Sequence, residues 1–185
     1  TSRRRKSLSV WVRLGYRRKA ESTKKKSKHN GHYDTPKELG KKWQMDVKYV
    51  PSACYAGEDG EKFYQYTMLE EASRKRFIYA YRETGGYSTC DFVKRAIIWF
   101  GYAPDIIQTD NGGEFTHTKK TKRIHPFDSL CAELHITHKL IRPRTPWHNG
   151  KVERSHREDQ KRFYSCHSFY SLDDFARQLA VHNRR

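Results

Sequence analysis

The feature that most constrains the fold is a change in hydrophobic periodicity at Trp43. From this residue the stretch WQMDVKYV alternates, which is the pattern of a strand with one buried face. Its apolar face comprises Trp43, Met45, Val47 and Tyr49, and its polar face comprises Gln44, Asp46 and Lys48. The rest of the chain must therefore supply a layer that covers the apolar face of a sheet.

The segments after this strand predict a mixed α/β order. Two aromatic-rich segments, KFYQYTMLEEA and KRFIYAYRE, predict antiparallel strands joined by a tight turn. A helix over 87–102 follows, for which Ser88 or Thr89 is a candidate N-cap and Gly101 a candidate stop. Strand, helix and strand patterns then cover 104–110, 127–135 and 136–141, and two helices cover 151–166 and 171–183. An initial meander followed by alternating elements predicts a mixed five-stranded sheet flanked by helices.

Charge divides the chain into two parts. Residues 1–42 carry 15 Lys and Arg against three acids, whereas the whole chain has a formal net charge of +17. We therefore expect a basic linker arm over 1–42, partly disordered, with a short strand or helix around LSVWVRLGY, and a folded domain over 43–185. A basic block of this length most often contacts nucleic acid, although a solvated linker or a targeting signal has the same composition.

Composition excludes some classes of protein. No apolar run approaches the roughly 20 residues of a membrane span, and no signal-peptide core opens the chain, so no membrane partner is expected. The four cysteines are widely spaced and form no CxxC motif, which indicates a reduced, cytoplasmic protein. The first residue is Thr, so we expect a segment of a longer protein.

Three acids stand out by their placement. Asp46 lies on the polar face of the first strand, Asp110 ends the strand of IIQTDNGGEF, and Glu153 lies one turn inside the helix after TPWHNG. Each has a simple structural explanation. Asp46 fits an exposed strand face, Asp110 a turn, and Glu153 an ion pair with Arg157 at i,i+4.

The sequence motifs around these acids favour a functional explanation. QMDVKYV, IIQTDNGGEF and PRTPWHNGKVERSHR resemble, in this order, the catalytic core of the DDE recombinases, which include insertion-sequence transposases and retroviral integrases. The resemblance covers roughly residues 40–183 and is most similar to the bacterial insertion-sequence branch. It implies a ribonuclease H-like fold and a DNA-associated bacterial protein.

The resemblance also implies a site and partners. Asp46, Asp110 and Glu153 would be the catalytic, metal-binding triad, with Asp46 bridging two Mg²⁺ ions for which Mn²⁺ is expected to substitute. The partners would be DNA, as transposon ends and target, and further copies of the chain on that DNA. Candidate DNA-binding residues are Arg142, Arg144, Asn149, Lys151, Arg154, Arg157 and Lys161.

Two departures from the family pattern are visible. The family commonly has about 35 residues between the second Asp and the Glu, but here residues 111–152 intervene. We assign the surplus to a loop insertion at THTKKTKRIHPF. Many of these transposases also carry a basic residue seven positions after the Glu, where this chain has Gln160.

Three functions compete. The first is a transposase or integrase core that cleaves and transfers DNA strands, the second is a ribonuclease H-like nuclease that only hydrolyses, and the third is a non-catalytic nucleic-acid-binding module. The basic arm and the motif wording favour the first function, and an unbroken triad argues against the third. The spacing of Cys131, His135 and His138 also allows a zinc site, but no second ligand pair is evident.

Overall fold

The described part of the chain forms an α/β domain. We analysed a computed structural model, which describes residues 35–57, 61–119, 121–142 and 146–184. The strand or helix expected around LSVWVRLGY, most of the basic arm and Arg144 lie outside the described residues.

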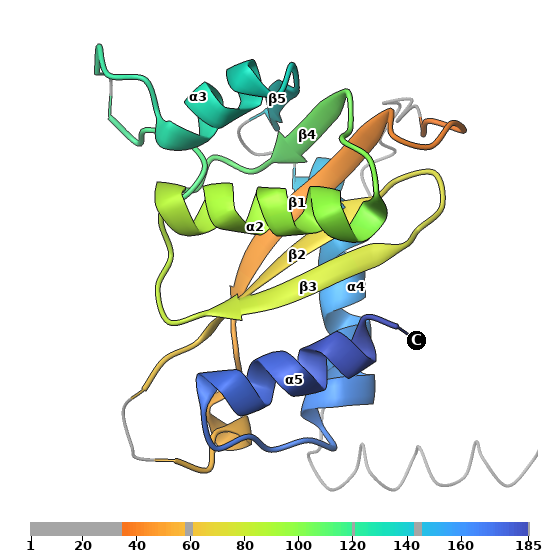
Figure 1. Cartoon of the computed structure of the whole chain (residues 1–185), viewed down its shortest axis with the longest axis vertical. Helices are drawn as coiled ribbons and strands as arrows, with labels where there is room; N and C mark the ends of the chain where they lie inside the picture. Colours follow the sequence, from red (N-terminus) through yellow and green to blue (C-terminus); the bar gives the residue numbers. More distant parts are fainter. Residues whose placement is uncertain (1–34, 58–60, 120, 143–145, 185) are drawn as a thin grey trace, which may run out of the picture. The chain divides into compact units, whose positions relative to one another are not determined.

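Five strands form one mixed sheet (Figure 1). The strand order is β3-β2-β1-β4-β5, in which β1 (Lys42–Tyr49), β2 (Tyr64–Glu70) and β3 (Arg76–Tyr81) form an antiparallel meander. The strands β4 (Ile106–Thr109) and β5 (Thr137–Leu140) are added parallel to β1. The predicted meander followed by alternating elements is thus confirmed.

Helices cover both faces of the sheet. Figure 1 shows α2 (Gly86–Phe100) crossing one face, with α3 (Pro126–Glu133) beside it, and α4 (Gly150–Asp159) behind the opposite face. Short 3-10 turns, η1 (Ser52–Cys54) and η2 (Pro146–Asn149), precede β2 and α4. The helix α4 continues as a π-helical turn, η3 (Gln160–Tyr164), and α5 (Leu172–His182) ends the described fold.

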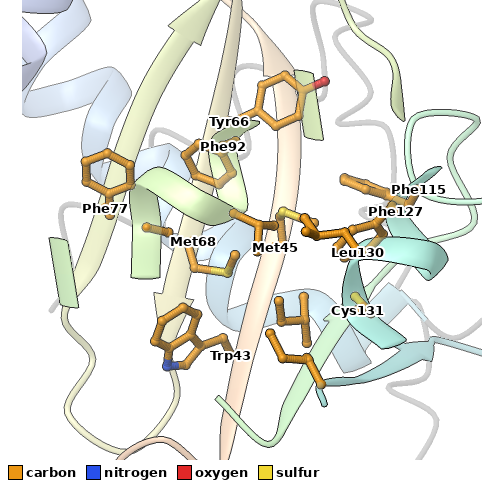
Figure 2. Close-up of a cluster of buried hydrophobic side chains, with 14 residues drawn as sticks. Trp43, Met45, Tyr66, Met68, Phe77, Phe92, Phe115, Phe127, Leu130 and Cys131 are labelled. Atoms are coloured by element: carbon orange, nitrogen blue, oxygen red, sulfur yellow. The ribbon is translucent and has the colours of Figure 1, made fainter. Parts of the chain in front are cut away.

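The alternation of β1 separates a core from a polar face. Trp43 and Met45 are fully buried beneath α2 together with side chains of β2 and α3 (Figure 2). Each large apolar side chain buried in this way contributes about 1.5–3 kcal/mol. The intervening residues Gln44, Asp46 and Lys48 face α4, since all three contact residues of that helix or of the turn before it. The strand that anchors the core therefore also points a row of polar groups at α4.

One helix boundary differs from the expectation. The N-cap of α2 is Gly85, and the predicted N-caps Ser88 and Thr89 lie buried in its first turn. A Cβ at Gly86 would lie 3.1 Å from the ring of His125, so glycine allows the helix to begin early in a crowded place. Gly101 ends the helix in the left-handed conformation, as predicted.

The segment between β4 and α3, to which we assigned the surplus residues, is a loop as predicted, except that Pro126 and Phe127 already belong to α3. Apart from residue 120, which is outside the described residues, positions 111–125 form turns and bends without a helix or strand. In the described residues no helix is both long and apolar enough to cross a membrane.

Candidate active site

Asp46 lies where the sheet meets α4. Its side chain is 16% exposed, and its Oδ1 accepts a hydrogen bond from the Val47 amide at 2.9 Å. Burial and, to a smaller extent, the negative charges of Asp110, Glu153 and Glu114 together raise the pKa of Asp46 to about 7. The carboxylate is therefore costly to ionise unless a cation is nearby.

Asp110 follows β4 directly and shapes a turn. Its Oδ1 accepts a hydrogen bond from the Gly112 amide at 2.9 Å, the pattern of an Asx turn. Because β1 and β4 are parallel and Gln44 is in register with Gln108, the two aspartates each lie two residues further along adjacent strands. Asp110 thus shapes a turn and also places a negative charge beside Asp46.

Glu153 is brought to the two aspartates by α4. It lies in the first turn of the helix, is exposed, and contributes to the raised pKa of Asp46. The three acids singled out in the sequence, which come from three separate elements, therefore interact electrostatically in the fold.

A fourth carboxylate, Glu114, was missed by the sequence analysis. Burial raises its pKa, as does the charge of Asp110, and Glu114 in turn raises the pKa of Asp46. Thr89 holds the backbone at this point by donating to the Glu114 carbonyl at 2.9 Å. The signal was available in TDNGGEF, where Glu114 is the second acid of the same turn.

No cationic side chain neutralises this group within the described residues. There, no lysine or arginine lies within 4.0 Å of the carboxylates of Asp46, Asp110 or Glu153. His156 Nδ1 lies 3.5 Å from Asp46 Oδ2, but burial and the charge of Lys48 lower the pKa of His156 to about 4. The ring is therefore neutral at pH 7, and the carboxylates keep their mutual repulsion.

The donor set fits a hard divalent cation in its chemistry. Carboxylate oxygens are the protein ligands that Mg²⁺ and Mn²⁺ prefer, and Asp46, Asp110 and Glu153 would supply them. Within the described part of the chain, however, no three His, Cys, Asp or Glu side chains are already gathered around one ion position. Like charges approach closely only when a cation compensates them, so we expect the three carboxylates to draw together when a cation binds.

The candidate DNA-binding residues have different environments. Arg154, Arg157 and Lys161 are exposed on α4 and η3, and Arg142 is exposed after β5. Asn149 is only 2% exposed at the N-cap of α4, and Lys151 Nζ lies 2.6 Å from the buried Glu71 carboxylate. The last two therefore interact with the protein itself in this structure.

The residues of the possible zinc site have other contacts. His138 binds Asp128 at 2.6 Å and Thr109 at 2.8 Å, and Cys131 is buried in the core. Burial raises the pKa of the Cys131 thiol to about 12, which opposes the thiolate that zinc requires.

Comparison with known proteins identifies the family of the chain. The family model "Integrase core domain" matches residues 36–146, and a second model with the same description matches residues 134–184. The chain belongs to the integrase core family. A putative integrase of Spiroplasma virus SpV1-C74 is 32% identical over 149 residues, which are 74% of this chain and 39% of that protein. The integrase core described here thus spans well under half the length of this relative.

Solved structures show the same fold. A chain in the structure of the simian T-cell lymphotropic virus intasome superposes with a TM-score of 0.65 at 20% identity, over 83% of this chain and 50% of that chain. The BIV integrase catalytic core gives 0.56 at 22% identity, over 78% and 81% of the two chains. The HTLV-2 catalytic core in complex with magnesium, in its trimeric form, gives 0.54 at 21% identity, over 76% and 82%. The predicted ribonuclease H-like fold, a mixed five-stranded sheet with helices, is confirmed.

Proposed function

We propose that this integrase core catalyses metal-dependent cleavage and transfer of DNA strands at the ends of a bacterial insertion sequence. One observation carries the proposal. Asp46 is a largely buried carboxyl whose pKa is raised to about 7 by burial and by three neighbouring acids, in a chain with a net charge of +17. Natural sequences rarely keep such repulsion unless function requires it.

The three acids share one proposed role. Asp46, on the central strand, Asp110, after β4, and Glu153, on α4, would together hold the cations. Two bound Mg²⁺ ions, or Mn²⁺ in their place, would activate a water or 3′-hydroxyl and stabilise charge on the attacking and leaving oxygens. The HTLV-2 core solved with magnesium supports this choice of cation.

The DNA is proposed to run along α4. Arg154, Arg157 and Lys161 are exposed on the helix that carries Glu153, so phosphate contacts there would bring the scissile bond to the carboxylates. Arg142, Arg144, Asn149 and Lys151 remain further predicted contacts. We propose that several copies act together on DNA, which the intasome of a structural relative supports.

Replacing Asp110 with Asn tests the function. The wild-type chain, with Mn²⁺ or Mg²⁺, is expected to nick supercoiled plasmid and to join a labelled oligonucleotide to it. The Asp110→Asn variant should lose both activities yet bind DNA as tightly as wild type or slightly more tightly, because repulsion of the phosphates falls. Asp105→Asn, which changes an exposed carboxylate before the same strand, is the matched control.

The products separate the competing functions. Nicking without joining would support a nuclease that only hydrolyses. DNA binding without nicking, and without saturable Mn²⁺ binding in calorimetry, would support a binding module. Wild-type activity in Asp110→Asn would overturn the assignment of the site.

A further inference from the structure

The first turn of α4 is capped by the sheet and not by its own N-cap residue. The first amides of a helix lack partners within the helix, and a side chain at the N-cap normally supplies one. Asn149 makes no such bond. Instead, the amide of Val152 donates to Oε1 of Gln44 at 3.2 Å. The cap of the helix that carries Glu153 therefore comes from β1.

A second glutamine binds the same turn. Gln44 Nε2 donates to the His148 carbonyl at 3.1 Å, and Gln108 Nε2 donates to that carbonyl at 2.8 Å. Gln44 and Gln108 are paired in the parallel β1–β4 ladder, and both are almost fully buried. The start of α4 is thus tied to two adjacent strands at one level of the sheet.

The position of this pair relates it to the carboxylates. Gln44 is two residues before Asp46 on β1, so these two side chains point to the same side of the sheet. Gln108 is two residues before Asp110, which directly follows β4. On α4, the capped amide of Val152 immediately precedes Glu153. Each of the three carboxylates therefore lies within two residues of a residue that takes part in this one set of hydrogen bonds.

Glu71 fixes the orientation of the Gln44 amide. Its buried Oε1 accepts from Gln44 Nε2 at 2.7 Å and lies 3.2 Å from Lys42 Nζ, while its Oε2 lies 2.6 Å from Lys151 Nζ. A flipped Gln44 amide would set its oxygen against the Glu71 carboxylate and its NH₂ group against the Val152 N–H. Only the observed orientation satisfies all three partners.

We propose that Gln44 and Gln108 are positioning residues that set Glu153 relative to Asp46 and Asp110, with Glu71 holding Gln44 in the active orientation. This inference rests on the proposed metal-dependent function and adds a residue role to it. Residues that orient a metal ligand without binding the metal themselves commonly change metal affinity or activity by about 10- to 100-fold when they are replaced.

The test compares buried glutamines at the two ends of α4. The Gln44→Met/Gln108→Met double variant removes both amides with little change in volume. Gln65→Met is the matched control, because Gln65 is also fully buried and donates to Asp159 at the far end of the helix at 2.9 Å. Each variant is measured for melting temperature, Mn²⁺ affinity by calorimetry, and hydrogen exchange in peptides covering 146–154 and 157–166.

The expected results differ by site. Both variants should melt at lower temperature, but only the double variant should bind Mn²⁺ about tenfold more weakly and exchange faster over 146–154. Gln65→Met should exchange faster over 157–166 and bind Mn²⁺ within about twofold of wild type. If the double variant does not fold, the single Gln108→Met variant, which leaves Gln44 and Glu71 intact, decides the same point.

The outcomes separate this inference from the proposed function. A folded double variant with wild-type Mn²⁺ affinity overturns the positioning role. Unchanged exchange over 146–154 overturns the hydrogen-bonded clamp itself, whatever the metal does. If the wild-type chain binds no Mn²⁺, the metal-dependent function fails and the positioning role with it, while exchange still reports on the clamp.

Discussion

Two groups of carboxylates lie beside α4, and the chain surrounds them with opposite partners. Glu71 and Asp159 are fully buried and are paired with Lys42 and Lys151 in one case and with Arg76 in the other. The carboxylate of Asp46 instead has three negatively charged neighbours, Asp110, Glu153 and Glu114. The described residues provide this group with no lysine or arginine partner. Although the chain is strongly basic, lysine and arginine pair with only one of the two groups, which distinguishes the paired structural acids from the acids that we propose bind a metal ion.

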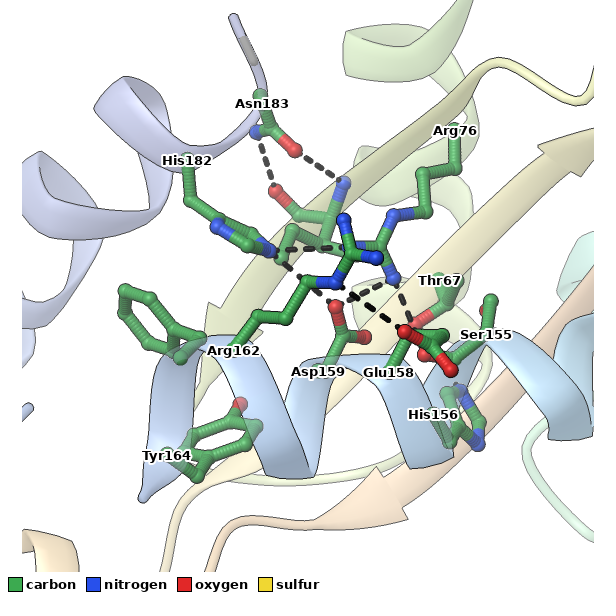
Figure 3. A network of polar contacts seen from close by, with 12 residues as sticks. Thr67, Arg76, Ser155, His156, Glu158, Asp159, Arg162, Tyr164, His182 and Asn183 are labelled. Carbon is green, nitrogen blue, oxygen red and sulfur yellow. Dashed lines mark hydrogen bonds and ion pairs between the residues drawn. The ribbon is translucent and has the colours of Figure 1, made fainter. Parts of the chain in front are cut away.

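The Asp159 group shows what a stabilising carboxylate requires. Figure 3 shows Asp159 at the end of α4 beside Arg76 and His182, with Tyr164 and Thr67 nearby. Burial alone would raise the pKa of Asp159, but its hydrogen bond to His182 and the charge of Arg76 hold it below its ordinary value. Burial acts on Asp46 in the same direction, yet there the neighbouring charges add to it.

The largest expected effect is a loss of catalytic activity, which should distinguish two glutamates of the same helix. Glu153→Gln should lower DNA cleavage and strand transfer by about 10³-fold, because a neutral amide neither neutralises nor holds the cations as a carboxylate does. Glu158→Gln is the control, since Glu158 is paired with Arg162 on the same helix. Plasmid nicking and oligonucleotide joining measure both variants. An equal loss of activity in the two variants would mean that damage to the helix, and not loss of the Glu153 carboxylate, causes the effect.

Much of this arrangement was predictable from the sequence, and the reason is local. The alternation from Trp43 predicted the faces of β1, and the motifs around Asp46, Asp110 and Glu153 named residues that the fold does bring into electrostatic contact. A short motif shows which residue follows a strand or begins a helix. Such motifs therefore predict the structural features that are determined by residues adjacent in the sequence.

What the sequence did not predict depends on distant partners. Gln44 caps α4 across 108 residues, and the role of Glu71 requires Lys42, Gln44 and Lys151 to meet. The expected single helix over 151–166 instead changes to a π-helical turn at Gln160, which is also where the family's basic residue is missing. No periodicity in the local sequence signals such contacts or a change of helix type.

The second prediction compares the two paired carboxylates. Asp159→Asn should lower the free energy of unfolding by about 3–4 kcal/mol, because Arg76 cannot lose its proton and is left without its carboxylate. Glu71→Gln should cost only about 2 kcal/mol, since the glutamine oxygen can still accept a hydrogen bond from Lys42 or Lys151 and Lys151 keeps its bond to Thr35. Urea denaturation at pH 8 measures both, and a larger loss in Glu71→Gln would contradict this account.

The third prediction concerns Asp46 and pH in the absence of divalent metal. The pKa of Asp46 in the folded state is about 7, whereas an ordinary aspartate has a pKa of 3.8, so the folded state binds more protons between these two values. The free energy of unfolding should therefore fall as the pH rises from about 4 to about 7. Asp46→Asn should remove this fall and stabilise the chain at pH 8 by about 2 kcal/mol, half of what 1.36 kcal/mol per pKa unit implies, because the surroundings relax.

Denaturation of Asp46→Asn and of Asp105→Asn across this pH range provides the measurement and its control. The charged groups that face Asp46 are Asp110, Glu153 and Glu114, with His156 neutral above pH about 4. Below that window the paired Asp159 acts with the opposite sign, because its lowered pKa makes protonation destabilising. A stability profile of Asp46→Asn parallel to that of wild type would mean that Asp46 carries no such repulsion.

The smallest expected effect tests which arginine side chains contact DNA. Arg157→Ala should reduce the slope of log affinity for DNA against log salt by about 0.9, as expected for one lost phosphate contact. Arg177→Ala, an exposed arginine of α5, should leave the slope unchanged although it removes the same charge. Equal slopes for the two variants would place the DNA elsewhere than along α4. Arginines that serve DNA and not the carboxylates at Asp46 would explain how a chain this basic leaves that group to a metal ion.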